Sequence, residues 1–208
     1  MAVDMNFSLT NKIALVTGGA SGIGKSICEN FAKKGVTVAV VDMNIAAAQQ
    51  LSADIKNGST AHVCDVTDIA SIDKAVQEVI SAHGRIDILV NSAGMAVLDP
   101  AEAVKASDWD STIAVNLSGT FFVSQSVGRE MLKVGKGKII NLASQAASVA
   151  LTDHVAYCAS KFGVLGVTKV LASEWGGRGI NVNSVSPTVV LTELGKKAWA
   201  GEKGDAHK

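Results

Sequence analysis

Six short runs rich in Val, Ile and Ala recur along the chain, and a longer segment with helical spacing follows each of the first five. Because these runs are apolar at nearly every position, both faces of each predicted strand must be buried, as in a parallel sheet covered by helices. The alternation predicts a doubly wound α/β fold of the Rossmann type. The predicted strands are 13–16, 36–41, 61–63, 86–90, 138–142 and 180–185. The predicted helices are 22–34, 44–56, 68–82, 107–133 and 156–175.

The length and composition of the chain fit a single cytoplasmic domain over residues 1–208, in which 190–208 begins a substrate lid or tail. The 19 Lys and Arg residues balance the 19 Asp and Glu residues, so no overall field attracts nucleic acid or an anionic membrane. The three cysteines form no CxxC pair and the four histidines are dispersed. This pattern argues against a metal site and for reduced thiols in the cytoplasm. No uncharged apolar stretch is long enough to span a bilayer.

A glycine-rich turn, TGGASGIG at 17–24, lies directly between the first predicted strand and the first predicted helix. Glycines there let the backbone approach a pyrophosphate at the helix N-terminus, where free N–H groups favour anions. Asp42 ends the second strand, and a carboxylate there accepts both ribose hydroxyls of NAD and repels the 2′-phosphate of NADP. The pattern therefore predicts a dinucleotide site that prefers NAD. The alternative is a glycine-rich turn that binds no ligand.

A second motif, YCASK at 157–161, places Tyr157 and Lys161 on one face of a predicted helix. A cation beside the phenol favours the phenolate and lowers its pKa from about 10 toward the working range of a base. Ser144 closes the fifth strand, at the sheet edge where open α/β sheets bind ligands, and can hydrogen-bond a substrate oxygen. The alternative is an amphipathic helix with an ordinary Tyr/Lys pair.

Together these motifs resemble those of the short-chain dehydrogenase/reductase family, over residues of about 11 to 199. The spacing T-G-x-x-x-G-I-G, the sequence NSAG at 91–94 and the Ser/Tyr/Lys spacing carry the resemblance. Two positions depart from the family pattern: Ser92 stands for its second Asn, and Thr188 for the Gly after Pro187. The resemblance implies hydride transfer between a nicotinamide and an alcohol or ketone, with Tyr157 as the proton acceptor.

The resemblance also implies roles for residues that spacing alone does not reveal. Asn116 becomes the fourth catalytic residue beside Ser144, Tyr157 and Lys161, ordering a water that leads from the lysine to solvent; an ordinary polar helix residue is the alternative. Lys161 also binds the nicotinamide ribose. The implied cofactor-binding residues are Gly18, Ser21, Gly22, Ile23, Gly24, Asp42, Asp65, Val66, Asn91, Ala93, Gly94, Tyr157, Lys161, Pro187, Thr188, Val190 and Thr192.

The substrate wall around the catalytic residues is expected to contain Gln145, Ala146, His154, Met95 and Ala96. Polar groups beside an apolar wall suit a polyhydroxylated ligand, although Gln145 and His154 could equally face solvent as loop residues. The residues around Ser144 and Tyr157 resemble the xylulose reductase and polyol dehydrogenase branch of the family. We therefore expect a sugar-alcohol dehydrogenase. The alternatives are a 3-oxoacyl or other secondary-alcohol reductase, and a non-catalytic NAD-sensing or scaffold protein.

Two expectations concern assembly and the end of the fold. The predicted helices at 108–133 and 157–175 carry apolar residues on more than one face, so a homo-oligomer formed through them would cover what the sheet does not. Loops of the same chain are the alternative cover. Family members usually continue into a further helix and a seventh strand, which this chain apparently lacks.

Overall fold

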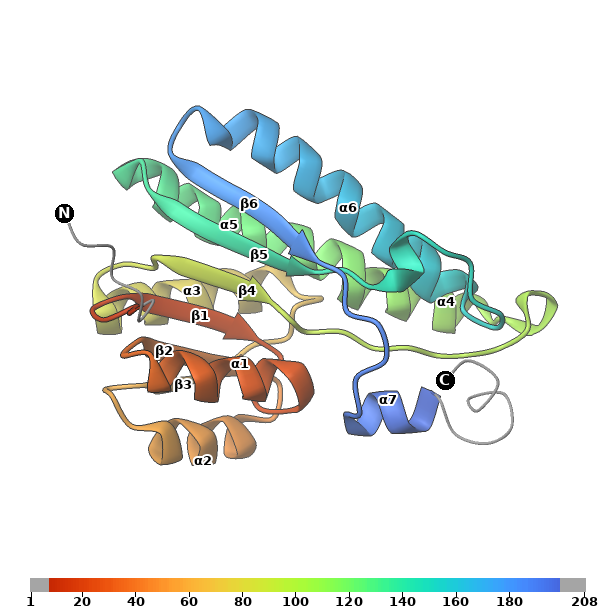
Figure 1. Ribbon diagram of the computed structural model, residues 1–208, viewed down its shortest axis with the longest axis horizontal. Coiled ribbons are helices and arrows are strands. Elements are labelled where there is room, and N and C mark those ends of the chain that lie inside the picture. The colour runs from red at the N-terminus through yellow and green to blue at the C-terminus, as the bar shows by residue number, and fades with distance from the viewer. Residues whose placement is uncertain (1–7, 199–208) are drawn as a thin grey trace.

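The computed structural model describes residues 8–198 of the chain. Six strands form one parallel sheet in the order β3-β2-β1-β4-β5-β6 (Figure 1). Their bounds are β1 Ile13–Thr17, β2 Thr37–Asp42, β3 Thr60–Val63, β4 Ile88–Asn91, β5 Gly137–Leu142 and β6 Ile180–Val185. The strand order therefore reverses between β1 and β4, and this junction is the topological switch point where such sheets bind ligands.

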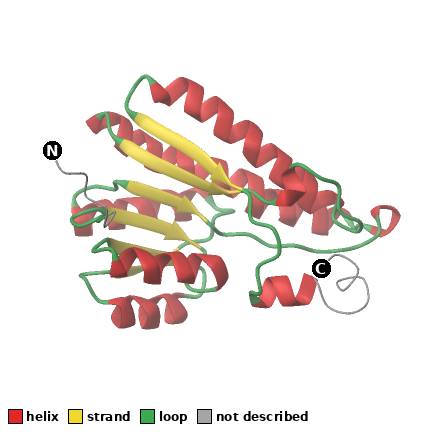
Figure 2. Ribbon diagram, viewed as in Figure 1, coloured by secondary structure: helices red, strands yellow, loops and turns green. Residues whose placement is uncertain are grey.

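Helices cover the sheet on two faces, as the apolar strands required (Figure 2). The α-helices are α1 Gly22–Lys33, α2 Ile45–Ile55, α3 Ile69–His83, α4 Ala106–Ile113, α5 Thr120–Val134, α6 Val155–Gly176 and α7 Glu193–Ala198. Helices α1 and α2 pack on one face, over β1 and β2. Helices α3, α5 and α6 pack on the other. The predicted doubly wound fold is confirmed.

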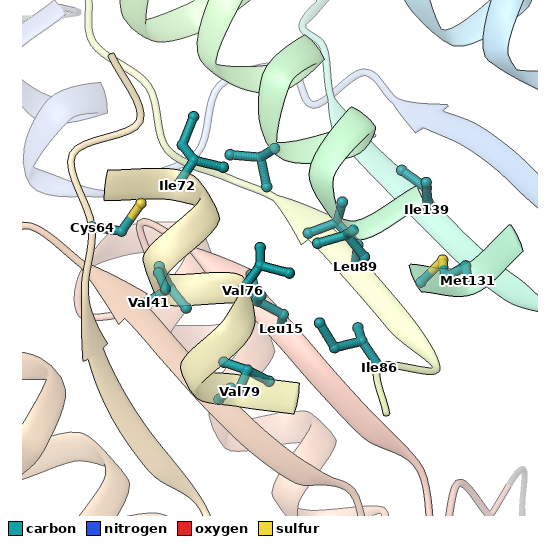
Figure 3. Close-up of a cluster of buried hydrophobic side chains, with 14 of the residues drawn as sticks. Leu15, Val41, Cys64, Ile72, Val76, Val79, Ile86, Leu89, Met131 and Ile139 are labelled. Carbon is teal, nitrogen blue, oxygen red and sulfur yellow. The ribbon is translucent and has the colours of Figure 1, made fainter. Parts of the chain in front are cut away.

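The larger core cluster lies between the sheet and the α3–α5–α6 layer (Figure 3). Leu15, Leu89 and Ile139 contribute to it from three adjacent strands, and each is at most 1% exposed. Val76 of α3 and Met131 of α5 fill the opposite side. Burying side chains of this size contributes about 1.5–3 kcal/mol each, so the sheet is a rigid base for the loops at its carboxyl edge.

The prediction of one continuous helix at 107–133 is wrong in one respect. Helices α4 and α5 are separated by a π-helical segment, η2 (Ala114–Gly119). The segment ends at Gly119, where a Cβ would lie only 2.9 Å from the Val66 side chain, so the close approach of Val66 requires glycine at this position. π-Helical turns are rare and are frequent at functional sites, and η2 contains Asn116.

Among the described helices, α6 alone has the length and composition of a membrane span, with a mean hydropathy of 1.3 over its most apolar window. Its inner face is part of the core, because Val164, Leu171 and Trp175 are buried. Only a third (33%) of that window is buried, so much apolar surface remains on its outer side.

Only part of the C-terminal region for which expectations were stated lies within the residues that the structure describes. Over residues 8–198 the sheet has six strands, with β6 at one edge. Of the predicted lid at 190–208, residues 199–208 lie outside the described residues. Helix α7 belongs to the described part of this lid.

Candidate active site

The glycine-rich turn is pressed against the segment that follows β4. Gly18 has a φ of +59°, and a Cβ there would lie 2.8 Å from the Cα of Ala93. A Cβ on Gly24 would lie 2.2 Å from the carbonyl oxygen of Gly18. Only glycine fits these two positions, and the turn becomes a bare backbone cradle.

Two further features make this cradle fit the pyrophosphate of a dinucleotide. Ser21 precedes α1 without making a side-chain cap, which leaves the first-turn N–H groups of the helix to an anion. The Thr17 hydroxyl accepts hydrogen bonds from the backbone N–H groups of Ser92 (3.1 Å) and Ala93 (3.2 Å), and so holds the ends of β1 and β4 together.

Asp42 lies at the end of β2, next to the same turn. Its Oδ2 accepts a hydrogen bond from the N–H of Ala20 (3.0 Å), and its Oδ1 accepts one from Asn44 (2.9 Å). Each carboxylate oxygen has a second lone pair, so the side chain can also accept hydrogen bonds from the hydroxyls of a ribose. Both backbone bonds fix the carboxylate beside the glycine-rich turn.

Lys161 is a buried charged group on α6. Only 5% exposed, it donates a hydrogen bond from Nζ to the carbonyl oxygen of Leu142 at 2.7 Å. Its Nζ lies 5.6 Å from the centroid of the Tyr157 ring. Burial lowers the pKa of Lys161 to about 8 from 10.5.

The pKa of Tyr157 lies above its ordinary value of 10.0, chiefly because burial disfavours the phenolate; hydrogen bonding to Ser144 opposes this effect. This direction is opposite to the one expected from the Tyr/Lys spacing. The physical reason is that desolvation is the largest effect on the Tyr157 phenol, whereas the neighbouring Lys161 ammonium donates its hydrogen bond to Leu142.

Ser144 stands two residues beyond the end of β5, not within the strand as predicted. It caps the short 3₁₀ helix η3 (Gln145–Ala147), accepting a hydrogen bond at its Oγ from the N–H of Ala146 (3.1 Å). Ser144 and Tyr157 are therefore brought together from two different elements, as the predicted catalytic set requires.

Asn116 is fully buried in η2, and its side chain is committed to the protein. Its Oδ1 accepts a hydrogen bond from the N–H of Met95 (2.8 Å), and its Nδ2 donates to the carbonyl oxygen of Met95 (2.9 Å). Nδ2 also donates to the hydroxyl of Ser160 (3.1 Å). The Asn116 side chain thus holds the loop after β4 against α6.

One cavity of about 300 Å³ brings most of the predicted residues together at the carboxyl ends of the strands. Of the predicted set, it is lined by Gly18, Ser21, Gly22, Ile23, Ala93, Gly94, Ser144, Gln145, His154, Tyr157, Lys161, Pro187, Thr188, Val190 and Thr192. Ala96, also expected in the substrate wall, lines it too, and so do residues outside the predicted set: Ser92, Leu142, Ala143, Leu151, Glu193 and Gly195. The backbone acceptor at Leu142 was missed because a carbonyl group carries no signal in the sequence.

The remaining predicted residues do not line this cavity: Gly24, Asp42, Asp65, Val66, Asn91, Met95, Asn116 and Ala146. The Asn91 side chain points into the interior, where its Nδ2 donates to Ser124 (2.8 Å) and Asn141 (2.8 Å). Asp65 accepts hydrogen bonds from the N–H and hydroxyl of Thr67, and these bonds lower the pKa of Asp65. The Asn91 amide and the Asp65 carboxylate therefore form hydrogen bonds with other groups of the protein.

His154 and Gln145 form a polar part of the cavity wall. The Nδ1 of His154 donates a hydrogen bond to the carbonyl oxygen of Thr152 (2.6 Å), which orients the ring. That ring stands edge-on to Tyr157, with 6.0 Å between the ring centroids. Leu151 and Val190 supply apolar wall beside them.

A family model described as short chain dehydrogenase matches residues 12–203. The chain belongs to this family. It is 59% identical to a D-threitol dehydrogenase of Mycolicibacterium smegmatis, an alignment that covers 100% of this chain and 81% of the relative. It is 48% identical to an NAD-dependent glycerol dehydrogenase of Listeria innocua, over 99% of this chain and 81% of the relative.

Comparison with solved structures agrees with this assignment: a putative short-chain alcohol dehydrogenase from Sinorhizobium meliloti superposes with a TM-score of 0.85 at 37% identity, covering 90% of this chain and 76% of that one. The crystal structure of gox2181 superposes with a TM-score of 0.92 at 33% identity, covering 97% of this chain and 81% of that one. The chain is therefore an oxidoreductase of the short-chain dehydrogenase family, whose members use nicotinamide cofactors. The predicted kinship with polyol dehydrogenases is confirmed.

The buried lysine leads to a prediction about stability. Between pH 8 and 10.5 the unfolded chain binds a proton at Lys161 that the folded chain does not, so stability rises with pH in this window. Below pH 8 the folded protein carries the full cost of the buried charge. Lys161→Met should therefore raise the free energy of unfolding at pH 7 by on the order of 1–3 kcal/mol.

Urea unfolding at pH 7 and at pH 9.5 tests this expectation. The advantage of Lys161→Met should shrink at the higher pH. Lys169→Met, which removes an exposed lysine from the same helix, should leave stability unchanged at both values. A loss of stability for Lys161→Met at pH 7 would contradict the cost assigned to the buried ammonium.

Proposed function

We propose that this chain oxidises a secondary hydroxyl of a small sugar alcohol to a ketone, with NAD as the cofactor. The convergence of Ser144, Tyr157 and Lys161 in one cavity beside the glycine-rich turn carries the proposal. Similarity to the threitol and glycerol dehydrogenases supports the choice of substrate class. Four-carbon and three-carbon polyols are the first candidates.

The proposed chemistry assigns one task to each catalytic residue. Ser144 and Tyr157 hold the oxygen of the alcohol, and Tyr157 accepts its proton. Lys161 stabilises the phenolate that this step requires, and binds the ribose next to the nicotinamide. Asn116 supports the site from η2, together with the water named above. NAD, when bound, supplies the acceptor for the hydride that leaves the carbinol carbon.

The polar wall supports a polyhydroxylated substrate over a simple alcohol. Gln145 and His154 face the cavity next to Ser144 and Tyr157. A site built to hydrogen-bond a second hydroxyl strongly rejects analogues that lack it. Met95 does not line the cavity, although its neighbour Ala96 does. Met95 is proposed to act on this wall through its backbone hydrogen bonds to Asn116.

The remaining roles follow from position. Asp42 is proposed to bind the adenosine ribose, and no Lys or Arg stands at 19–21 or 43–44 to neutralise a 2′-phosphate. Asp65, Val66 and Asn91 are proposed to support the adenine side. Val190 and Thr192 line the cavity, which supports a covering role for the described residues from 190 onward. The chain is proposed to act as a single domain in the cytoplasm.

A panel of polyols tests the reaction. With NAD, threitol and glycerol should be turned over faster than butan-2-ol, and Tyr157→Phe should lower kcat by about 10²–10⁴-fold while leaving NAD binding nearly intact. Lys161→Ala should lower both kcat and the affinity for NAD. Isothermal titration calorimetry measures the affinity for NAD. Near-normal turnover by Tyr157→Phe would refute the chemistry. Faster reduction of a 3-oxoacyl thioester would instead reassign the substrate.

Cofactor preference should reside in Asp42. Asp42→Ala removes acceptors for two ribose hydroxyls, so kcat/KM for NAD should fall by about 10- to 100-fold, since hydrogen bonds to a charged group contribute about 1.5–3 kcal/mol. The same change removes the repulsion of a 2′-phosphate, so kcat/KM for NADP should rise. A wild-type preference for NADP in this assay would overturn the assignment.

We also propose that the chain forms at least a dimer through α4, α5 and α6. Phe162 and Val170 on α6 are each about half exposed, at 50% and 54%. Phe121 and Phe122, near the start of α5, are only partly buried and pack edge-to-face. Contiguous exposed apolar surface marks protein–protein contact sites, and these helices would supply such a surface.

Sedimentation velocity at micromolar concentration tests the assembly. The wild type should sediment as a dimer or larger species, and Phe162→Glu should shift it toward the monomer because a charge cannot be buried there without a partner. Ile69→Glu is the matched control, because Ile69 is an equally exposed apolar residue (51%) on α3, outside the proposed interface. A monomeric wild type would exclude the interface.

A further inference from the structure

Ser160 is a buried hydroxyl for which the chemistry above has no use. It lies on α6 directly before Lys161 and is fully buried. Its Oγ donates a hydrogen bond to the carbonyl oxygen of Tyr157 (2.7 Å) and accepts one from the Nδ2 of Asn116 (3.1 Å). Ser160 is not among the described residues that line the cavity. It can therefore act on the reaction only through its neighbours.

Asn116 extends this contact from α6 to the loop after β4. Its amide pairs with both the N–H and the carbonyl oxygen of Met95, as a neighbouring strand would. These two bonds use its oxygen and one of its N–H groups, and Ser160 receives the other. The hydroxyl of Ser160 therefore completes a connection between the catalytic helix, η2 and the loop.

The loop held in this way forms the cavity floor next to the reacting groups. Gly94 lines the cavity, and a Cβ on it would lie 3.4 Å from the Oδ1 of Asn116 and 3.9 Å from the Nζ of Lys161. Gly94 thus fills the space between the amide and the ammonium. A shift of Asn116 would move this floor relative to Lys161.

We propose that Ser160 is a positioning residue, which through Asn116 sets the distance between the Gly94–Met95 loop and the helix turn carrying Tyr157 and Lys161. The inference rests on the catalytic roles proposed above for those two residues. Ser160→Ala leaves a buried N–H of Asn116 without its acceptor, so the loop loses one of its restraints. A small misplacement of reacting groups costs far more rate than binding.

Thr168 provides a matched control on the same helix. Its hydroxyl is buried, donates to the carbonyl oxygen of Val164 (2.7 Å) and accepts from the Nδ2 of Asn141 (2.9 Å). Thr168→Ala therefore removes the same kind of hydroxyl with the same two hydrogen bonds, two turns away from the cavity. A role confined to stability should affect both variants alike.

The first test compares steady-state kinetics at matched folded concentration. Ser160→Ala should lower kcat by about 10- to 100-fold with little change in KM for NAD, whereas Thr168→Ala should keep the wild-type kcat. Ser160→Thr, which retains the hydroxyl, should recover most of the loss. Adding Ser160→Ala to Asn116→Ala should cost nothing further, because both act through one connection. A kcat for Ser160→Ala equal to that of Thr168→Ala would overturn the proposal.

The second test does not depend on turnover. Amide hydrogen exchange, read by mass spectrometry without cofactor, should be faster at 94–96 and 114–119 in Ser160→Ala than in Thr168→Ala. Unchanged exchange there would overturn the positioning role even if the proposed substrate were wrong. Should Ser160→Ala fail to fold, Ser160→Cys keeps the side-chain size with a weak hydrogen-bonding group, and the same two comparisons decide.

Discussion

The pairing of the Thr17 hydroxyl with the N–H groups of Ser92 and Ala93 is the contact on which the site depends. It joins the ends of β1 and β4, the two strands between which the strand order reverses. On one side of this junction the chain turns into the bare glycine cradle, and on the other it runs through Gly94 toward Asn116. A cofactor bound in the cradle would therefore be placed by the sheet itself next to the side chains proposed for catalysis.

The part of the site proposed for catalysis contains a buried ammonium group, and its burial costs free energy. An apolar sheet with two covered faces is a poor environment for an ammonium, and the lowered pKa of Lys161 expresses that penalty. The same desolvation raises the pKa of Tyr157, so burial in the protein does not by itself favour the phenolate. What it prepares is geometry: Leu142 fixes the lysine, while Ser144 contacts the phenol. Stability lost at these groups is offset by the apolar core beneath them.

The sequence predicted the strands and most of the helices to within one or two residues, because runs such as 36–41 have only one way to bury both faces. It could not predict η2, since the residues AVNLSG have the same helical pattern in an α-turn as in a π-turn. The direction of the Tyr157 pKa shift also could not be predicted from the sequence, because the burial that causes it depends on how the helices and the sheet pack together. The link from Lys161 to Leu142 was missed for a simpler reason: the acceptor is backbone.

Two buried amide side chains help to determine where the loops that follow β4 and β5 begin. Asn91 and Asn141 are register partners on β4 and β5, and their side chains are hydrogen-bonded to each other. A slip of one residue would turn each amide to the other face of the sheet, against apolar side chains and without partners. The Oδ1 of Asn91 has no partner in the described part of the chain, so this arrangement is kept despite an unpaired acceptor. Register fixed in this way also fixes where β4 and β5 end, and therefore where Gly94 and Ser144 emerge relative to Tyr157. The polar seam inside the core thus sets the geometry at its surface.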